Sequence, residues 1–181
     1  MAKKQPNLQP QNLPFSFSTA SLGIDVVIRI SPKDLIMIES EGIYHYSLIL
    51  DKIKLFGGQL SYVFYHSSKK PDDPQIVLEK NVDGFLAVVD YIWAKREDRM
   101  TRLLKNVDIA RFEGPGFFKN THSYSDKAPK WWIYDKNGRE LETVLELSAH
   151  QKSYPLLSRI DDIIMTKRIR EKWSILNDPR I

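Results

Sequence analysis

The chain contains no cysteine among its 181 residues. This absence excludes disulfide scaffolds, thiolate metal sites and cysteine nucleophiles. Because a chain without thiols suits both oxidising and reducing surroundings, it leaves the compartment open.

Long apolar runs are also absent. No stretch approaches the roughly 18 apolar residues of a membrane span, and the N-terminus lacks the compact apolar centre of a signal peptide. We therefore expect an intracellular, cytoplasmic protein without a membrane span. The balance of 27 basic and 23 acidic residues gives a net charge of +4, which favours anionic partners only mildly.

Motifs of known catalytic chemistry are missing as well. The sequence has no Gly-x-Gly-x-x-Gly, no phosphate-binding loop, no Gly-x-Ser-x-Gly and no His-Glu-x-x-His. The four histidines stand apart from one another and from carboxylates at ligand spacing. They are His45, His66, His122 and His150. We therefore expect no metal, no cofactor and no enzymatic activity, and turn to binding functions.

Composition predicts a single globular domain preceded by an arm. Residues 1–22 combine prolines, glutamines and asparagines with isolated apolar side chains. Such a segment cannot bury enough surface to offset its ordering entropy, so we expect a flexible arm there. The domain would span residues 23–181. In the alternative interpretation the arm docks on a neighbouring subunit through Phe15 and Phe17.

Short β-branched and apolar runs predict a meander of antiparallel strands. The run at Leu35–Glu39 follows Ser31-Pro32-Lys33-Asp34, which would also start a helix. Periodicity does not decide so short a run, and we predict a strand. The other predicted strands are 24–30, 43–50, 53–56, 59–65 and 107–112, with 76–78 as a further candidate.

Two helices are predicted to cover this sheet. Asn81 caps the first, whose apolar residues recur at the spacing of one helical face. They are Phe85, Val88, Val89, Ile92 and Trp93. Residues 95–105 continue this helix or form another after a kink. The last helix begins near Ser153 and Pro155. The expected fold class is therefore α+β, a mostly antiparallel β-sheet packed against two α-helices.

The strongest local signal is a β-hairpin at residues 130–147, where two alternating runs flank Asn137-Gly138. A two-residue type I′ loop would place Trp132 opposite Thr143 and bury that face. A type I turn over 135–138 with a G1 bulge would place Trp131 opposite Thr143 instead. We favour this second register, because aspartate suits the first turn position. The buried face would then carry Trp131, Ile133, Leu141, Leu145 and Leu147.

A basic cluster and the other face of the hairpin together indicate a nucleic-acid site. The cluster consists of Lys95, Arg96, Arg99, Arg102 and Lys105. On a helix, several of these side chains would line one side. Cations bind phosphates and aromatic faces stack on bases. The stacking surface would be formed by Lys130, Trp132 and Tyr134.

These patterns lead us to expect a non-catalytic binding or assembly protein, with single-stranded RNA or DNA as its ligand. The alternative is a structural subunit of a homo-oligomer or larger protein assembly that uses the N-terminal arm. Glu140 and Glu142 lie opposite the aromatics in the favoured register and would repel phosphate. A solvated helix face and a packed hairpin, one side of which is covered by a helix, explain the same residues without a ligand.

Overall fold

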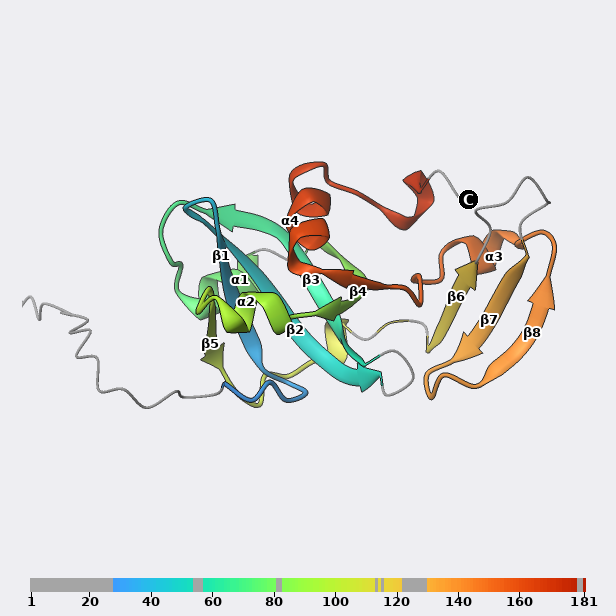
Figure 1. The fold of residues 1–181 in the computed structure, drawn as a ribbon, viewed down its shortest axis with the longest axis horizontal. Helices are drawn as coiled ribbons and strands as arrows, with labels where there is room; N and C mark the ends of the chain where they lie inside the picture. Colours follow the sequence, from blue (N-terminus) through green and yellow to red (C-terminus); the bar gives the residue numbers. More distant parts are fainter. Residues whose placement is uncertain are drawn as a thin grey trace, which may run out of the picture.

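A computed structural model describes residues 28–53, 57–80, 83–112, 114, 116–121, 130–178 and 181. Within these residues the chain forms two β-sheets and several short helices (Figure 1). The α+β class and the mostly antiparallel sheet are confirmed. The described residues include no helix with the length and apolar character needed to cross a bilayer. The predicted arm, with Phe15 and Phe17, lies outside the described residues.

The larger sheet has six strands in the order β5-β1-β2-β3-β4-β9. Its strands are β1 (Leu35–Ser40), β2 (Ile43–Ile53), β3 (Gly58–Ser68), β4 (Gly84–Asp90), β5 (Met100–Leu104) and β9 (Arg159–Asp161). Neighbouring strands are antiparallel, except that β4 and β9 run parallel. The described helices are α1 (Pro74–Lys80), α2 (Ile92–Arg96), η2 (Ala110–Phe112), α3 (Ala149–Lys152), α4 (Asp162–Arg170) and η3 (Ile175–Asn177).

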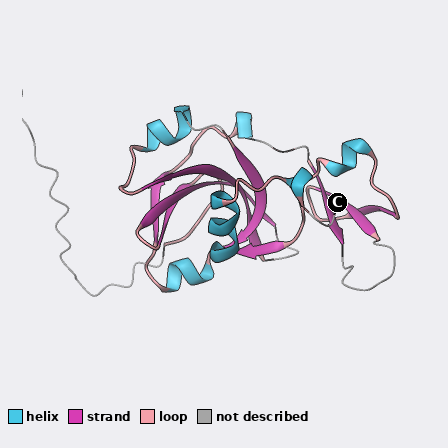
Figure 2. Cartoon of the chain, turned by 90° about the horizontal axis from the view of Figure 1, so that it is seen from above, coloured by secondary structure: helices cyan, strands magenta, loops and turns pink. Residues whose placement is uncertain are grey.

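Both faces of the six-stranded sheet are buried, with helices on either side of it (Figure 2). Along β1, Ile36 and Ile38 enter the core beneath α2 and α4. The alternate residues, Leu35 and Met37, enter a second core beneath α1 and η2. A strand that is covered on both faces is apolar throughout. Two-sided burial therefore explains why the run at Leu35–Glu39 forms a strand, as predicted, rather than a helix.

The predicted helix from Asn81 is wrong. Residues 84–90 form strand β4, in which Phe85 and Val89 face one core while Val88 faces the opposite side. Because both sides of β4 are covered, apolar residues occur on both faces of the strand. Their spacing also fits one face of a helix, which is why the sequence predicted a helix here. The helix begins only at Ile92 and ends at Arg96.

Four further sequence predictions are corrected by the structure. Residues 100–104 form strand β5 rather than a helix, because they complete the edge of the sheet beside β1. The candidate strand at 76–78 lies inside helix α1, and the predicted strand at 107–112 ends in the 3-10 helix η2. Residues 28–30 are not in a strand.

The last helix begins later than predicted. Asp161 caps α4 by accepting a hydrogen bond from the Ile164 backbone N–H at 2.7 Å. The segment around Ser153 instead ends the short helix α3, whose start at Ser148 forms a capping box with Gln151. The prediction that Ser153 starts the last helix is therefore wrong, because Ser153 lies at the end of α3.

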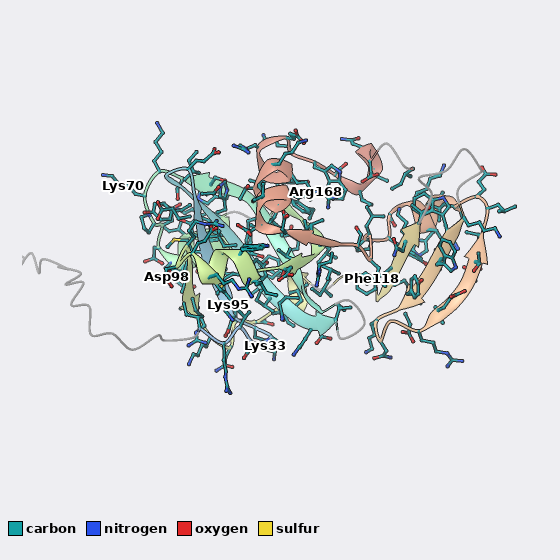
Figure 3. All side chains as sticks on the ribbon, viewed as in Figure 1. Lys33, Lys70, Lys95, Asp98, Phe118 and Arg168 are labelled. Carbon is teal, nitrogen blue, oxygen red and sulfur yellow. The ribbon has the colours of Figure 1, made fainter. Side chains whose placement is uncertain are left out.

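The smaller sheet has the order β6-β7-β8 and lies at the opposite end of the molecule from β5 (Figure 1). Its strands are β6 (Phe117–Thr121), β7 (Trp131–Asp135) and β8 (Glu140–Val144). A separate apolar cluster joins the two sheets, and its member Phe118 lies between them (Figure 3). Residues 155–157 pair with β6 through Lys119, and the chain then continues into β9 of the larger sheet. One short segment therefore ties both sheets together.

The hairpin is confirmed, and its turn has the predicted type. The Gly138 N–H donates to the Asp135 carbonyl at 3.0 Å, and Gly138 has a φ of 79°. Tyr134 then pairs with Glu140, as in the favoured register, but a bulge that skips Leu141 shifts the pairing beyond it. Trp132 thus faces Thr143, as in the other register.

Burial on the hairpin follows this bulge. The predicted inward residues Trp131, Ile133 and Leu147 are buried. Leu141 and Leu145 are 50% and 66% exposed, so their predicted burial is wrong. The bulge takes Leu141 out of the alternating pattern, which is the physical reason for the difference.

Candidate functional site

The structure divides the predicted nucleic-acid residues between two distant places. Lys95 and Arg96 lie on α2, Arg102 lies on β5, and Arg99 and Lys105 flank that strand. The hairpin residues Lys130, Trp132 and Tyr134 belong to the smaller sheet, at the other end of the molecule (Figure 1). The basic cluster and the hairpin aromatics therefore do not form one continuous face.

Two arginines of the predicted cluster have internal partners. Arg99 Nη2 lies 2.8 Å from Asp162 Oδ2, and its Nε lies 2.7 Å from Glu97 Oε2. Burial alone would lower the pKa of Arg99, but the hydrogen bonds to these two carboxylates raise it. Arg102 lies 3.6 Å from Asp34 and donates to the Arg29 carbonyl. Both guanidinium groups therefore bind other parts of the chain and are not fully available to a phosphate.

The hairpin aromatics are only partly available. Trp132 and Tyr134 are half-buried, and Tyr134 packs against the cluster that joins the sheets. Partial burial, and then the nearby Glu140 carboxylate, raise the pKa of the Tyr134 hydroxyl. Lys130 is exposed. This side of the hairpin is therefore covered in part by strands of the larger sheet, and not by a helix as expected.

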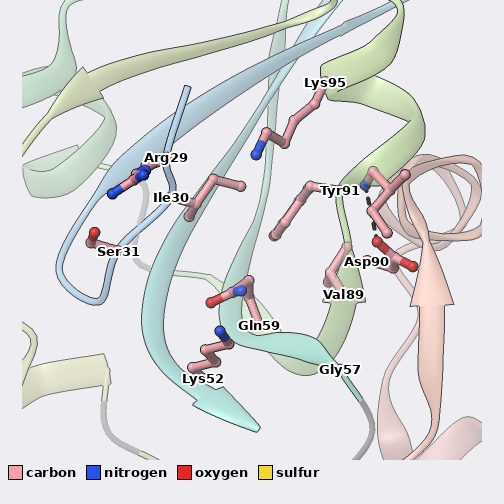
Figure 4. Close-up of a pocket in the computed structure, with 11 residues that line it drawn as sticks. Arg29, Ile30, Ser31, Lys52, Gly57, Gln59, Val89, Asp90, Tyr91 and Lys95 are labelled. Atoms are coloured by element: carbon pink, nitrogen blue, oxygen red, sulfur yellow. Dashed lines mark hydrogen bonds between the residues drawn. The ribbon is translucent and has the colours of Figure 1, made fainter. Parts of the chain in front are cut away.

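Lys95, in contrast, lines a cavity of about 360 Å³ (Figure 4). We call it the cationic pocket, because Arg29, Lys52 and Lys95 reach it from three segments that are distant in the sequence. Figure 4 shows the Lys95 ammonium pointing toward the space between Ile30 and Tyr91. Of these three cations, only Lys95 belonged to the site predicted from the sequence.

The wall of the pocket is fixed by local structure at the end of β4. Asp90 Oδ1 accepts a hydrogen bond from the Ile92 backbone N–H at 3.0 Å, where α2 begins. The buried Tyr91 hydroxyl makes hydrogen bonds of 2.7 Å and 2.9 Å with the hydroxyls of Ser47 and Ser61. Burial raises the pKa of Tyr91 to about 12, so its hydroxyl stays neutral at physiological pH. These contacts hold α2, and with it Lys95, in place.

The charges around the pocket are unbalanced. Among the described residues, Arg29, Lys52 and Lys95 form no ion pair. The lining carboxylate of Asp90 has its own cation, because Arg159 Nη1 lies 3.6 Å away. Gln59 also lines the pocket, and its buried Oε1 accepts no hydrogen bond from any residue that the structure describes. The pocket therefore attracts anions.

An exposed aromatic residue follows one of the pocket residues on α2. Ile92 lines the pocket and is 47% exposed, and the following residue, Trp93, is 54% exposed. The Arg96 guanidinium lies over the Trp93 ring, 5.2 Å from its centroid. The sequence pattern had placed Trp93 on a buried helical stripe, and the later start of α2 explains its exposure.

The remaining polar pairs do not assemble into one catalytic group. His45 Nδ1 lies 2.8 Å from Ser67 Oγ, and His66 Nε2 lies 2.6 Å from Asp72 Oδ2. Since Tyr46 stacks on His66 and side chains alternate along β2, the two pairs lie on opposite faces of the sheet. The described part of the chain also has no group of three or more histidines and carboxylates suited to hold a metal ion.

Comparison with known proteins finds no family model, no curated protein and no solved structure that matches this chain.

Proposed function

We propose that the chain is a non-catalytic binding protein for single-stranded nucleic acid, and that it binds this ligand at the cationic pocket and Trp93. The proposal rests on one observation: Arg29, Lys52 and Lys95 line one cavity, and none of them forms an ion pair with another described residue. The proposal includes a cytoplasmic location, because single-stranded nucleic acid is found there.

The two parts of this surface match the two parts of a nucleotide. Lysine and arginine neutralise phosphate and release bound counter-ions, so affinity falls as salt rises. An exposed indole accepts any base by stacking, which contributes about 1–3 kcal/mol per base. Trp93 does not line the pocket, but it follows the pocket residue Ile92 on α2, and the proposal is that one short strand contacts both parts.

The test is fluorescence anisotropy of a labelled oligonucleotide, titrated at several salt concentrations. For the natural chain we expect a slope of log K against log salt of roughly −1 to −2. Lys52→Glu and Lys95→Glu should each weaken binding at least tenfold. Lys136→Glu is the matched control, since it makes the same charge change at an exposed position in the hairpin turn. An equal loss in all three variants would show non-specific attraction and contradict the proposal.

A second pair of variants separates this site from the hairpin. Trp93→Ala removes the exposed indole beside the pocket, and Trp132→Ala removes the half-buried indole of β7. We expect only Trp93→Ala to weaken binding, by about tenfold, which corresponds to the loss of one stacked base. A loss confined to Trp132→Ala would move the site to the hairpin.

The second candidate function is a structural subunit of a homo-oligomer or larger protein assembly. It is favoured by strand β8, which lies at the edge of its sheet and exposes Leu141, and by the exposed Leu145 directly after it. An edge strand with exposed apolar residues is a template for pairing with another chain. Analytical ultracentrifugation tests it: assembly should be lost on Leu145→Glu and on deletion of residues 1–22. Unchanged sedimentation in both variants would remove this function.

A further inference from the structure

We infer that the cationic pocket takes a terminal phosphate, that is, a phosphomonoester, rather than an internal phosphodiester of the strand. The inference rests on the proposed function and makes it more specific. It is carried by the walls of the pocket and by its charge.

The walls favour the end of a chain. Residues 29–31 form one wall, Lys52 and Gln59 at the ends of β2 and β3 form another, and residues 89–95 form the third. A volume of about 360 Å³ lies at the lower end of the range for small-molecule sites, roughly 300–1,000 Å³. It has room for one phosphate and part of a sugar. An internal phosphate would need space for the chain to enter and leave.

The charge favours a dianion. A phosphomonoester carries about −1.5 to −2 charges near neutral pH, whereas a phosphodiester carries one. Arg29, Lys52 and Lys95 supply three positive charges, and the single lining carboxylate, Asp90, is held by Arg159. A terminal phosphate therefore uses more of the available charge than an internal one.

The experiment compares one oligonucleotide in three forms: with a 5′-phosphate, with a 3′-phosphate and with hydroxyls at both ends. We expect one phosphorylated form to bind about tenfold tighter than the unphosphorylated strand, as for one additional charged contact. Lys52→Gln and Lys95→Gln should remove most of this preference. The control variant Lys136→Gln should keep it. Thermal unfolding of each variant checks that the fold is intact.

The outcomes distinguish this inference from the function on which it rests. Equal affinity for all three forms overturns the terminal-phosphate site but leaves nucleic-acid binding in place. No binding of any form overturns both. If a nucleoside monophosphate competes as strongly as the phosphorylated strand, the phosphomonoester site is supported. The same result would contradict the proposal that the ligand is a nucleic-acid strand.

Discussion

The two sheets of this molecule are stabilised in different ways. The six-stranded sheet is covered on both faces, by α2 and α4 on one side and by α1 and η2 on the other. The three-stranded sheet buries one face of its hairpin and leaves β8 exposed at the edge. The larger sheet can therefore hold side chains in fixed positions around a pocket. The smaller sheet depends on its attachment to the larger one.

Their surfaces differ in charge as well. Three cations surround the pocket of the larger sheet, whereas β8 and the residues after it carry Glu140, Glu142 and Glu146. An anionic ligand is thus attracted to one end of the molecule and repelled at the other. The difference shows that function need not lie on the hairpin, even though the hairpin has the clearest local sequence signal.

The largest expected effect concerns the cluster that joins the sheets. Phe118 is 4% exposed and contributes to the cluster that also contains Val88 of β4. Phe118→Ala should destabilise the protein by about 3–5 kcal/mol, because it removes a buried ring and leaves a cavity. Urea unfolding followed by tryptophan fluorescence measures this change.

The neighbouring residue provides the control for Phe118. Phe117 is 39% exposed and stacks on Tyr154, with ring centroids 5.5 Å apart. Phe117→Ala should cost only about 1 kcal/mol. If Phe118→Ala had the same small effect, the two sheets would not depend on each other, and the comparison between them would fail.

The next effect is a loss of stability in acid that originates in the larger sheet. Burial and, to a smaller extent, the Arg170 guanidinium lower the pKa of His45 from 6.5 to about 4, against the opposing effect of Glu41. The unfolded chain binds a proton at this histidine below about pH 6.5, and the folded chain binds it only below about pH 4. Stability is therefore fully present above pH 6.5 and falls as the pH falls toward 4, by up to about 3 kcal/mol.

The variant His45→Gln isolates this contribution, because an amide can still form a hydrogen bond with Ser67 but does not titrate. Urea unfolding at pH 7, 5.5 and 4 should show a smaller loss of stability in the variant than in the natural chain. Parallel pH profiles would contradict the assignment of the loss to His45.

A smaller effect is expected beneath the pocket. Tyr91→Phe removes a buried hydroxyl that bonds Ser47 and Ser61. The loss should be about 1–2 kcal/mol, because two buried serine hydroxyls lose a partner. Oligonucleotide affinity, measured by anisotropy below the unfolding transition, should fall only slightly, since the pocket cations remain. A loss of affinity as large as that of Lys95→Glu would give Tyr91 a direct role in binding.

The same contrast explains which parts of the fold could be predicted from the sequence. In the hairpin, Asn137-Gly138 marks the turn, and burial alternates along β7, where Trp131 and Ile133 are buried while Trp132 and Tyr134 are only half-buried. Strand β4 is buried on both sides, so Phe85, Val88 and Val89 show no alternation and also fit a helix. Sequence periodicity reports one-sided burial well and two-sided burial poorly.

The candidate site was predictable only in part. Lys95 was identified within a run of basic residues, but Arg29 is a single charge within an apolar run and Lys52 stands between Asp51 and Ile53, far in the sequence from the other two pocket cations. Only the pairing of the strands brings them together, and no local pattern records that pairing. The exposure of Trp93 depends on where α2 begins, and the boundary of a short helix is poorly marked in the sequence.

The smallest expected effect compares one substitution in the hairpin of each sheet. Gly138 has a φ of 79° in the turn before β8, and Gly42 has a φ of 72° between β1 and β2, where an added Cβ meets nothing within 4 Å. Replacing either glycine by alanine should cost about 1 kcal/mol through backbone strain alone. If the sheets unfold as one unit, both variants shift a single transition equally. If Gly138→Ala instead shifts only an early step, seen by hydrogen exchange of residues 131–144, the smaller sheet opens by itself while the pocket stays intact.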